Sequence, residues 1–86
     1  MMEKETFYLI CFESTQKAFY TERQLASKIA GLRIVPIPPE IRASCGLGLK
    51  IVPEDFDTVK SAVLSEDIYI VQKEGNKRNV QKWEQE

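Results

Sequence analysis

Histidine is absent from this 86-residue chain, and its absence removes several kinds of catalytic site. Ser-His and Cys-His nucleophile pairs need an imidazole, and so do the zinc sites that use histidine ligands. Acid–base or nucleophilic chemistry in this domain would therefore have to use carboxylates, lysines or a thiol. We expect neither a bound metal nor an organic cofactor.

Cysteine is scarce, because the chain contains only Cys11 and Cys45. Two cysteines so far apart do not make the disulfide framework of a small secreted domain. Cys11 lies inside an apolar run, so we interpret it as a packing residue. Cys45 falls in an irregular connection and is the one thiol to which the sequence gives a chemical role.

The chain also lacks long hydrophobic runs and an excess of charge of either sign. Its apolar run over residues 7–12 is too short for a signal peptide or a membrane span, and residues 1–5 are acidic rather than basic. We therefore expect a cytoplasmic protein with no membrane partner. Twelve basic and thirteen acidic residues give a formal net charge of −1. That balance disfavours a nucleic-acid partner, because such proteins gather lysine and arginine on one face.

The length is enough for a single domain. A chain of this size buries roughly 60–65% of the surface that its unfolded form exposes, which supports one core. We predict one α+β domain over residues 1–74, followed by a polar tail or short helix over residues 75–86. Val80 and Trp83 are the tail side chains expected to dock on the domain.

Hydrophobic periodicity predicts four strands and two helices. Alternating or continuous apolar residues indicate strands, and apolar residues three or four apart indicate helices, with Ser14-Thr15 and Pro53 at the two helix starts. The expected strands cover residues 6–12, 32–37, 46–52 and 67–72, and the expected helices cover residues 15–30 and the segment from 53 to about 63. The order β-α-β-β-α-β predicts a ferredoxin-like domain, a four-stranded antiparallel sheet with both helices on one face.

This topology places the candidate site. The end of the first strand, the start of the first helix and the loop between the second and third strands then share one end of the sheet. Cys45 is expected near Ser14 and Thr15, where the backbone N–H groups and dipole of the helix start would stabilise a thiolate.

The segment around Cys45 has three further features that favour a reactive thiol. It lies in a connection, Gly46 and Gly48 leave the neighbouring backbone uncovered for another molecule, and Arg42 is close enough in sequence to favour the thiolate, while Ser44 is the adjacent hydroxyl. The alternative interpretation makes Cys45 a small packing residue at a strand start, with glycines present only for turn geometry.

With these residues in view, the chain resembles the selenium/sulfur carrier-like family, small bacterial proteins whose function is itself inferred. The resemblance covers about residues 7–71. It rests on four short patterns: Phe12-x-Ser14-Thr15, Val35-Pro36-x-Pro38, Ile41-x-x-Ser44-Cys45-Gly46-x-x-Leu49 and Pro53-Glu54-Asp55.

The resemblance implies that Cys45 carries sulfur or selenium, as a persulfide or selenosulfide, between enzymes. The protein partner would be a cysteine desulfurase or a selenium-using enzyme, and the chain itself would be a carrier rather than an enzyme. Two other functions stay open at this point. One is a protein-interaction or regulatory module with a structural Cys45, and the other is a thiol redox sensor that oxidises Cys45.

Overall fold

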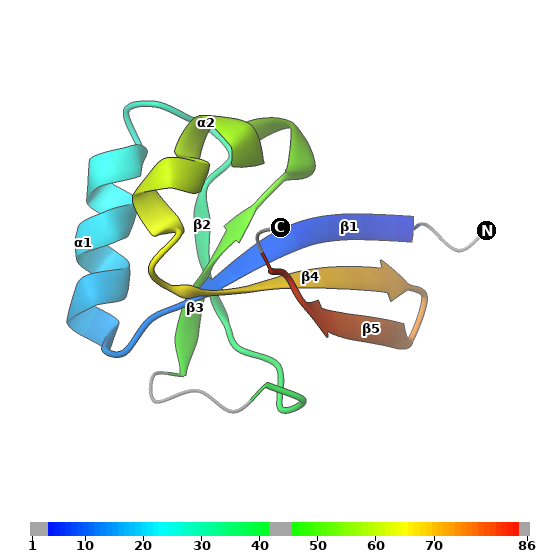
Figure 1. The fold of residues 1–86 in the computed structure, drawn as a ribbon. Helices are drawn as coiled ribbons and strands as arrows, with labels where there is room; N and C mark the ends of the chain where they lie inside the picture. The colour runs from blue at the N-terminus through cyan, green and yellow to red at the C-terminus, as the bar shows by residue number, and fades with distance from the viewer. Residues whose placement is uncertain (1–3, 42–45, 85–86) are drawn as a thin grey trace.

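The chain folds into five strands and two helices within the part that the computed structural model describes, residues 4–41 and 46–84 (Figure 1). In chain order these are β1 (Lys4–Cys11), α1 (Thr15–Leu25), β2 (Arg33–Pro36), β3 (Leu47–Ile51), α2 (Pro53–Val63), β4 (Asp67–Glu74) and β5 (Lys77–Lys82). Neither of these two helices is long and apolar enough to cross a membrane.

The strands form one antiparallel sheet in the order β2-β3-β1-β4-β5. The prediction of an α+β fold with two helices is confirmed. The predicted four-stranded sheet is wrong by one strand, because β5 extends the sheet beyond β4. Strand β1 lies at the centre, where Cys11 pairs with Gly48 of β3 on one side and with Asp67 of β4 on the other.

Strand β5 replaces the expected tail. A two-residue turn at Gly75-Asn76 joins β4 to β5, and Glu74 pairs with Lys77 across it. Gly75 has φ of 60°, while no other described residue has a positive φ, which fits a type II′ hairpin turn with glycine in the first central position. Val80 then pairs with Val71, so one of the two expected docking residues docks through a strand.

Helix α1 begins where expected and ends earlier. Ser14 caps it by accepting a hydrogen bond from the Lys17 N–H at 3.1 Å. The helix stops at Leu25, not near residue 30, because a tight turn follows in which the N–H of Lys28 bonds the Leu25 carbonyl at 2.9 Å. Ile29 is buried just after that turn. Because it follows Leu25 at helical spacing, the sequence predicted a longer helix than the one that forms.

Helix α2 matches its prediction. Pro53 occupies the first turn with Glu54 and Asp55, where a missing N–H costs nothing and carboxylates suit the helix dipole. Phe56, Val59 and Val63 form its buried face, as their spacing indicated.

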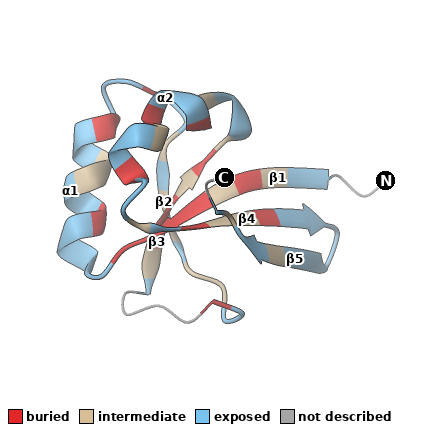
Figure 2. Cartoon of the chain, in the orientation of Figure 1, coloured by how far each residue is buried: buried red, intermediate tan, exposed pale blue. Residues whose placement is uncertain are grey.

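Both helices cover the same face of the sheet, here called the helix-covered face, which presents Tyr8 and Ile10 of β1. Its core joins strand residues to side chains from α1 and α2 (Figure 2). The ring of Phe56 stacks on Tyr8 with centroids 3.8 Å apart, and Trp83 meets Phe56 edge-on at 5.2 Å. The opposite face, here called the open face, carries Phe7, Leu9 and Cys11 of β1. No described helix packs on the open face; its apolar cluster is completed by Ile37 and Ile41 from the β2–β3 connection.

Candidate functional site

The expected meeting of elements at one end of the sheet is present. Strand β1 leaves the sheet at Cys11, and its partner Gly48 lies one residue after the start of β3. Helix α1 begins four residues after Cys11, at Thr15. The start of β3 and the start of α1 therefore belong to the same end of the sheet, which Figure 1 shows below and beside α1.

Three of the predicted site residues, Arg42, Ser44 and Cys45, lie outside the described residues. The other three, Ser14, Thr15 and Gly46, lie within them, and all three are exposed. Ser14 and Thr15 are the cap and the first residue of α1, as predicted. The helix therefore starts where it was predicted to start. The hypothesis that this helix start stabilises a thiolate at Cys45 stays a prediction.

An ion pair at the start of α1 was missed by sequence reasoning. The Lys17 ammonium lies 2.7 Å from a carboxylate oxygen of Glu66, whose side chain is only 8% exposed. The hydrogen bond to Glu66 raises the pKa of Lys17 above its usual value. Because Glu66 already compensates this charge, the positive potential of the helix start rests mainly on backbone N–H groups. The two partners are 49 residues apart in the chain, so no local sequence pattern could predict the pair.

Gly46 is joined to the rest of the connection through its backbone. Its carbonyl accepts a hydrogen bond from the Ile37 N–H at 2.9 Å, which joins the two ends of the β2–β3 connection. A Cβ built at Gly46 would meet no atom of residues 4–41 or 48–84 within 4 Å, and its φ is not in the region that favours glycine. Within the described part of the chain, neither packing nor backbone strain requires glycine at this position.

Gly48 differs from Gly46 in this respect. A Cβ at Gly48 would lie 2.8 Å from the Ile10 carbonyl oxygen and 3.3 Å from the Ile37 side chain. The side chain of Ile37 occupies the space that the missing Cβ leaves. Gly48 is therefore a packing glycine, and the prediction that it opens the backbone for a partner is wrong. For Gly46 the same hypothesis stays a prediction.

The β2–β3 connection is fixed to the open face up to Ile41. Ile41 is 7% exposed and packs in the same cluster as Cys11. Its N–H bonds the Pro38 carbonyl at 3.0 Å. Next to it, Glu40 makes a two-pronged ion pair with Arg78 of β5, at 2.6 and 2.7 Å. Both ends of the segment that carries Cys45 are thus tied to the sheet.

Cys11 is confirmed as a packing residue. It lies inside β1 with 4% of its surface exposed, among Phe7, Leu9 and Val71. Burial in such an apolar cluster disfavours a thiolate, so Cys11 does not compete for the chemical role. Within the described ranges, no group of three histidine, cysteine or acidic side chains is placed to hold a metal ion.

These features define the class of protein: a small α+β domain in which the antiparallel sheet, α1 and the β2–β3 connection meet at one end. Residues 7–72 match the family described as "Putative Se/S carrier protein-like", and the chain belongs to that family. The matched stretch runs from β1 into β4 and takes in the whole β2–β3 connection, while β5 lies beyond it. No curated protein and no solved structure is similar enough to match the chain.

Proposed function

We propose that this chain is a sulfur or selenium carrier that relays the element on Cys45 between enzymes. The observation that supports this function is the family match, which spans Cys45 and the elements on both sides of it. The protein partner would be a cysteine desulfurase or a selenium-using enzyme. The carrier needs no catalytic apparatus of its own, because the donor performs the chemistry.

The proposed transfer is an exchange without net oxidation or reduction. The Cys45 thiolate attacks the terminal sulfur of a donor enzyme's cysteine persulfide and forms a new S–S bond. The donor's own S–S bond breaks, and its cysteine leaves as a thiolate. Cys45 then holds the persulfide until an acceptor takes the outer sulfur. Selenium follows the same course with a selenium atom in the outer position, giving a selenosulfide.

Two described features support this role. The α1 start at Ser14 and Thr15 belongs to the end of the sheet from which β3 begins, and a helix start favours an anion. Gly46, directly after Cys45, is exposed, and no atom of the described residues beyond its neighbours lies within 4 Å of a potential Cβ. A donor enzyme must bring its own persulfide into contact with the carrier thiol, and an uncovered backbone beside that thiol removes a steric obstacle. Arg42 and Ser44 complete the proposed site as neighbours that favour the thiolate.

The first experiment measures the reactivity of Cys45. Alkylation by iodoacetamide is followed against pH by intact mass in a Cys11→Ala background, and the same protein is incubated with a cysteine desulfurase and free cysteine. The expected results are a thiol pKa below the reference of about 8.5 and a mass gain of one sulfur atom on Cys45. The Cys45→Ser variant should gain no sulfur.

Two comparisons sharpen this test. Gly46→Ala should leave stability unchanged and slow sulfur transfer from the enzyme, while its alkylation by the small reagent stays near that of the parent. A thiol with an ordinary pKa that gains no sulfur would contradict the carrier function. Oxidation by peroxide without sulfur gain would indicate a redox sensor instead, and full cellular function of Cys45→Ala would indicate an interaction module.

A further inference from the structure

A hollow of about 360 Å³ lies on the open face, beside residues 35–39 at the start of the β2–β3 connection. Residues that are directly paired across antiparallel strands point to the same face of the sheet. Lys50 of β3 is paired with Leu9. Lys73 of β4 is paired with Glu5, and Arg78 of β5 is paired with Lys73. Three cations, here called the rim cations, therefore border this hollow on the open face: Lys50, Lys73 and Arg78.

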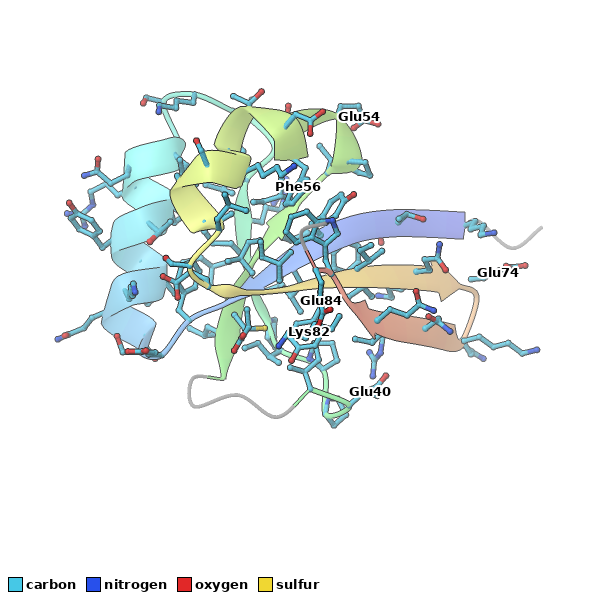
Figure 3. All side chains as sticks on the ribbon, viewed as in Figure 1. Glu40, Glu54, Phe56, Glu74, Lys82 and Glu84 are labelled. Atoms are coloured by element: carbon cyan, nitrogen blue, oxygen red, sulfur yellow. The ribbon has the colours of Figure 1, made fainter. Side chains whose placement is uncertain are left out.

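The side of the hollow next to the connection is an aliphatic wall. Val35, Ile37 and Pro38 line the hollow and are half-buried. Val35 and Ile37 pack against the apolar cluster of the open face, which holds the wall in place. In Figure 3, Glu40 of the connection lies on the other side of β4 and β5 from Phe56 of α2, in accord with a connection on the face that the helices do not cover. A ligand in the hollow would therefore meet apolar surface on one side and cations on the other.

Two of the rim cations have a carboxylate partner and the third has none among the described residues. Lys50 lies 2.8 Å from Glu5, and Arg78 lies 2.6 Å from Glu40. Lys73 stands opposite Glu5 across the β1–β4 pair, but no described carboxylate lies within ion-pair distance of its ammonium group. One further negative charge would therefore complete the balance at the rim.

The open face as a whole has the same excess of positive charge. By strand register, and with Glu40 of the connection included, its described residues carry five basic and three acidic side chains, in a chain whose formal net charge is −1. The basic residues are Arg33, Lys50, Lys73, Arg78 and Lys82, and the acidic residues are Glu5, Glu40 and Asp67. Such a face attracts anions through its electrostatic potential.

We propose that this hollow binds a small organic acid that has one carboxylate and a short aliphatic chain. The carboxylate pairs with Lys73, and the aliphatic chain lies against Val35, Ile37 and Pro38. The volume of about 360 Å³ is near the lower end of the range for small-molecule pockets, which suits a short chain. The site takes no part in the chemistry of Cys45, so it is a binding function in addition to the proposed carrier function.

Two other kinds of anion suit the hollow less well. An inorganic phosphate would pair with the rim cations and leave the aliphatic wall in water. A nucleotide base stacks on accessible aromatic rings. The aromatic ring that borders the hollow belongs to Phe7, which is 7% exposed and has the Lys50 ammonium 4.6 Å from its centroid. A carboxylate with an aliphatic chain uses both the charge and the wall.

Hexanoate is the probe that tests this proposal. It is titrated into the full chain, and binding is followed by amide NMR shifts. We expect saturable binding, with the largest shifts at Val35, Ile37, Lys50, Lys73 and Arg78. Three matched probes separate the two parts of the ligand: hexanol lacks the charge, hexylammonium reverses it, and acetate lacks the chain. Each of the three should bind at least about fivefold more weakly than hexanoate.

Variants of the chain test which side chains make the contacts. Lys73→Gln should bind hexanoate about fivefold more weakly, because the carboxylate loses its cation. Lys77→Gln is the matched control and should bind as the parent does, since Lys77 is also exposed but is paired with Glu74 on the face of Tyr8. Val35→Thr keeps the shape of the wall and makes it polar, and it should weaken binding about threefold. Amide dispersion checks that each variant is folded.

Several results would overturn the proposal. Equal binding of hexanol or hexylammonium would contradict charge recognition, and equal binding of acetate or inorganic phosphate would indicate a site for small anions alone. Tighter binding of a nucleotide would contradict the aliphatic wall as the contact surface. An equal loss in Lys73→Gln and Lys77→Gln would indicate unspecific attraction, and absence of saturable binding would remove the site. Cys45→Ala should bind hexanoate as the parent does, so failure of this test and failure of the sulfur-transfer test are distinguishable.

Discussion

The two faces of the sheet are buried by different means. Leu9 and Ile10 are consecutive residues of β1, and both are fully buried. Ile10 lies under two helices, within a core that includes Phe56, Val59 and Val63. Leu9 lies under Ile37 and Ile41, two side chains of the β2–β3 connection. One face is therefore covered by regular structure and the other by the connection that also carries the candidate site, so burial on the open face and organisation of the site depend on the same segment.

The largest expected effect on stability comes from shortening a side chain in the core of the helix-covered face. Ile10→Ala should lower the free energy of unfolding by about 2–5 kcal/mol, since the rigid surroundings leave a cavity. Leu9→Ala should fall toward the lower end of that range, because Ile37 and Ile41 can move into the space. Urea unfolding of both variants measures the difference. A larger loss for Leu9→Ala would show that the connection is as rigid as the helices.

A smaller effect is expected from the two glycines at the start of β3. Gly48→Ala should destabilise the fold by about 1–3 kcal/mol, because its methyl group would press on the Ile10 carbonyl and displace Ile37. Gly46→Ala should change stability by less than about 0.5 kcal/mol, since no described residue beyond its neighbours lies within 4 Å of the added Cβ. Thermal unfolding of the pair gives the comparison. Similar losses at both positions would contradict the assignment of Gly46 to partner access.

The smallest expected effect on stability comes from the ion pair between Glu40 of the β2–β3 connection and Arg78 of β5. The hydrogen bonds from Arg78 lower the pKa of Glu40 below its usual 4.5. A carboxyl group whose pKa is lowered by folding stabilises the fold above its unfolded value and loses that contribution as the pH falls through the folded value. Glu40→Gln should therefore be slightly less stable than the parent at neutral pH and equal to it well below pH 4.5.

The control for this comparison is Asp57→Asn, at an exposed carboxylate of α2. Its difference from the parent should not show the same pH dependence. The measurement is urea unfolding of all three proteins at neutral and acidic pH. A difference between Glu40→Gln and the parent that persists in acid would show that the glutamate acts through packing and not through its charge.

The sequence predicted the elements that carry their own local signals. Ser14 and Pro53 mark helix starts because capping and the missing proline N–H act within one turn. Strand β5 was missed because only Val80 among its six residues is apolar, so no alternation appears. The dipeptide Gly75-Asn76 is the signal that could have found it, since glycine followed by asparagine between two strands is typical of a type II′ hairpin.

The candidate site was predictable only in outline. Chain order placed the start of β3 and the start of α1 at one end, because that follows from which strands pair. The Lys17–Glu66 and Glu40–Arg78 pairs were not predictable, since their partners are 49 and 38 residues apart and are brought together by the tertiary structure alone. The same holds for Gly48, whose need for glycine depends on where Ile37 packs.

The two outer strands of the sheet also affect how the chain behaves in a crowded solution. An exposed strand edge can pair with a strand of another molecule, and proteins prevent this pairing with charged residues and proline at the edge. Strand β5 carries Lys77, Arg78 and Lys82 with no acidic residue, so two copies pairing there would bring like charges together. Strand β2 has only four residues and ends at Pro36, which cannot donate a hydrogen bond. The sheet therefore discourages self-association at both of its borders.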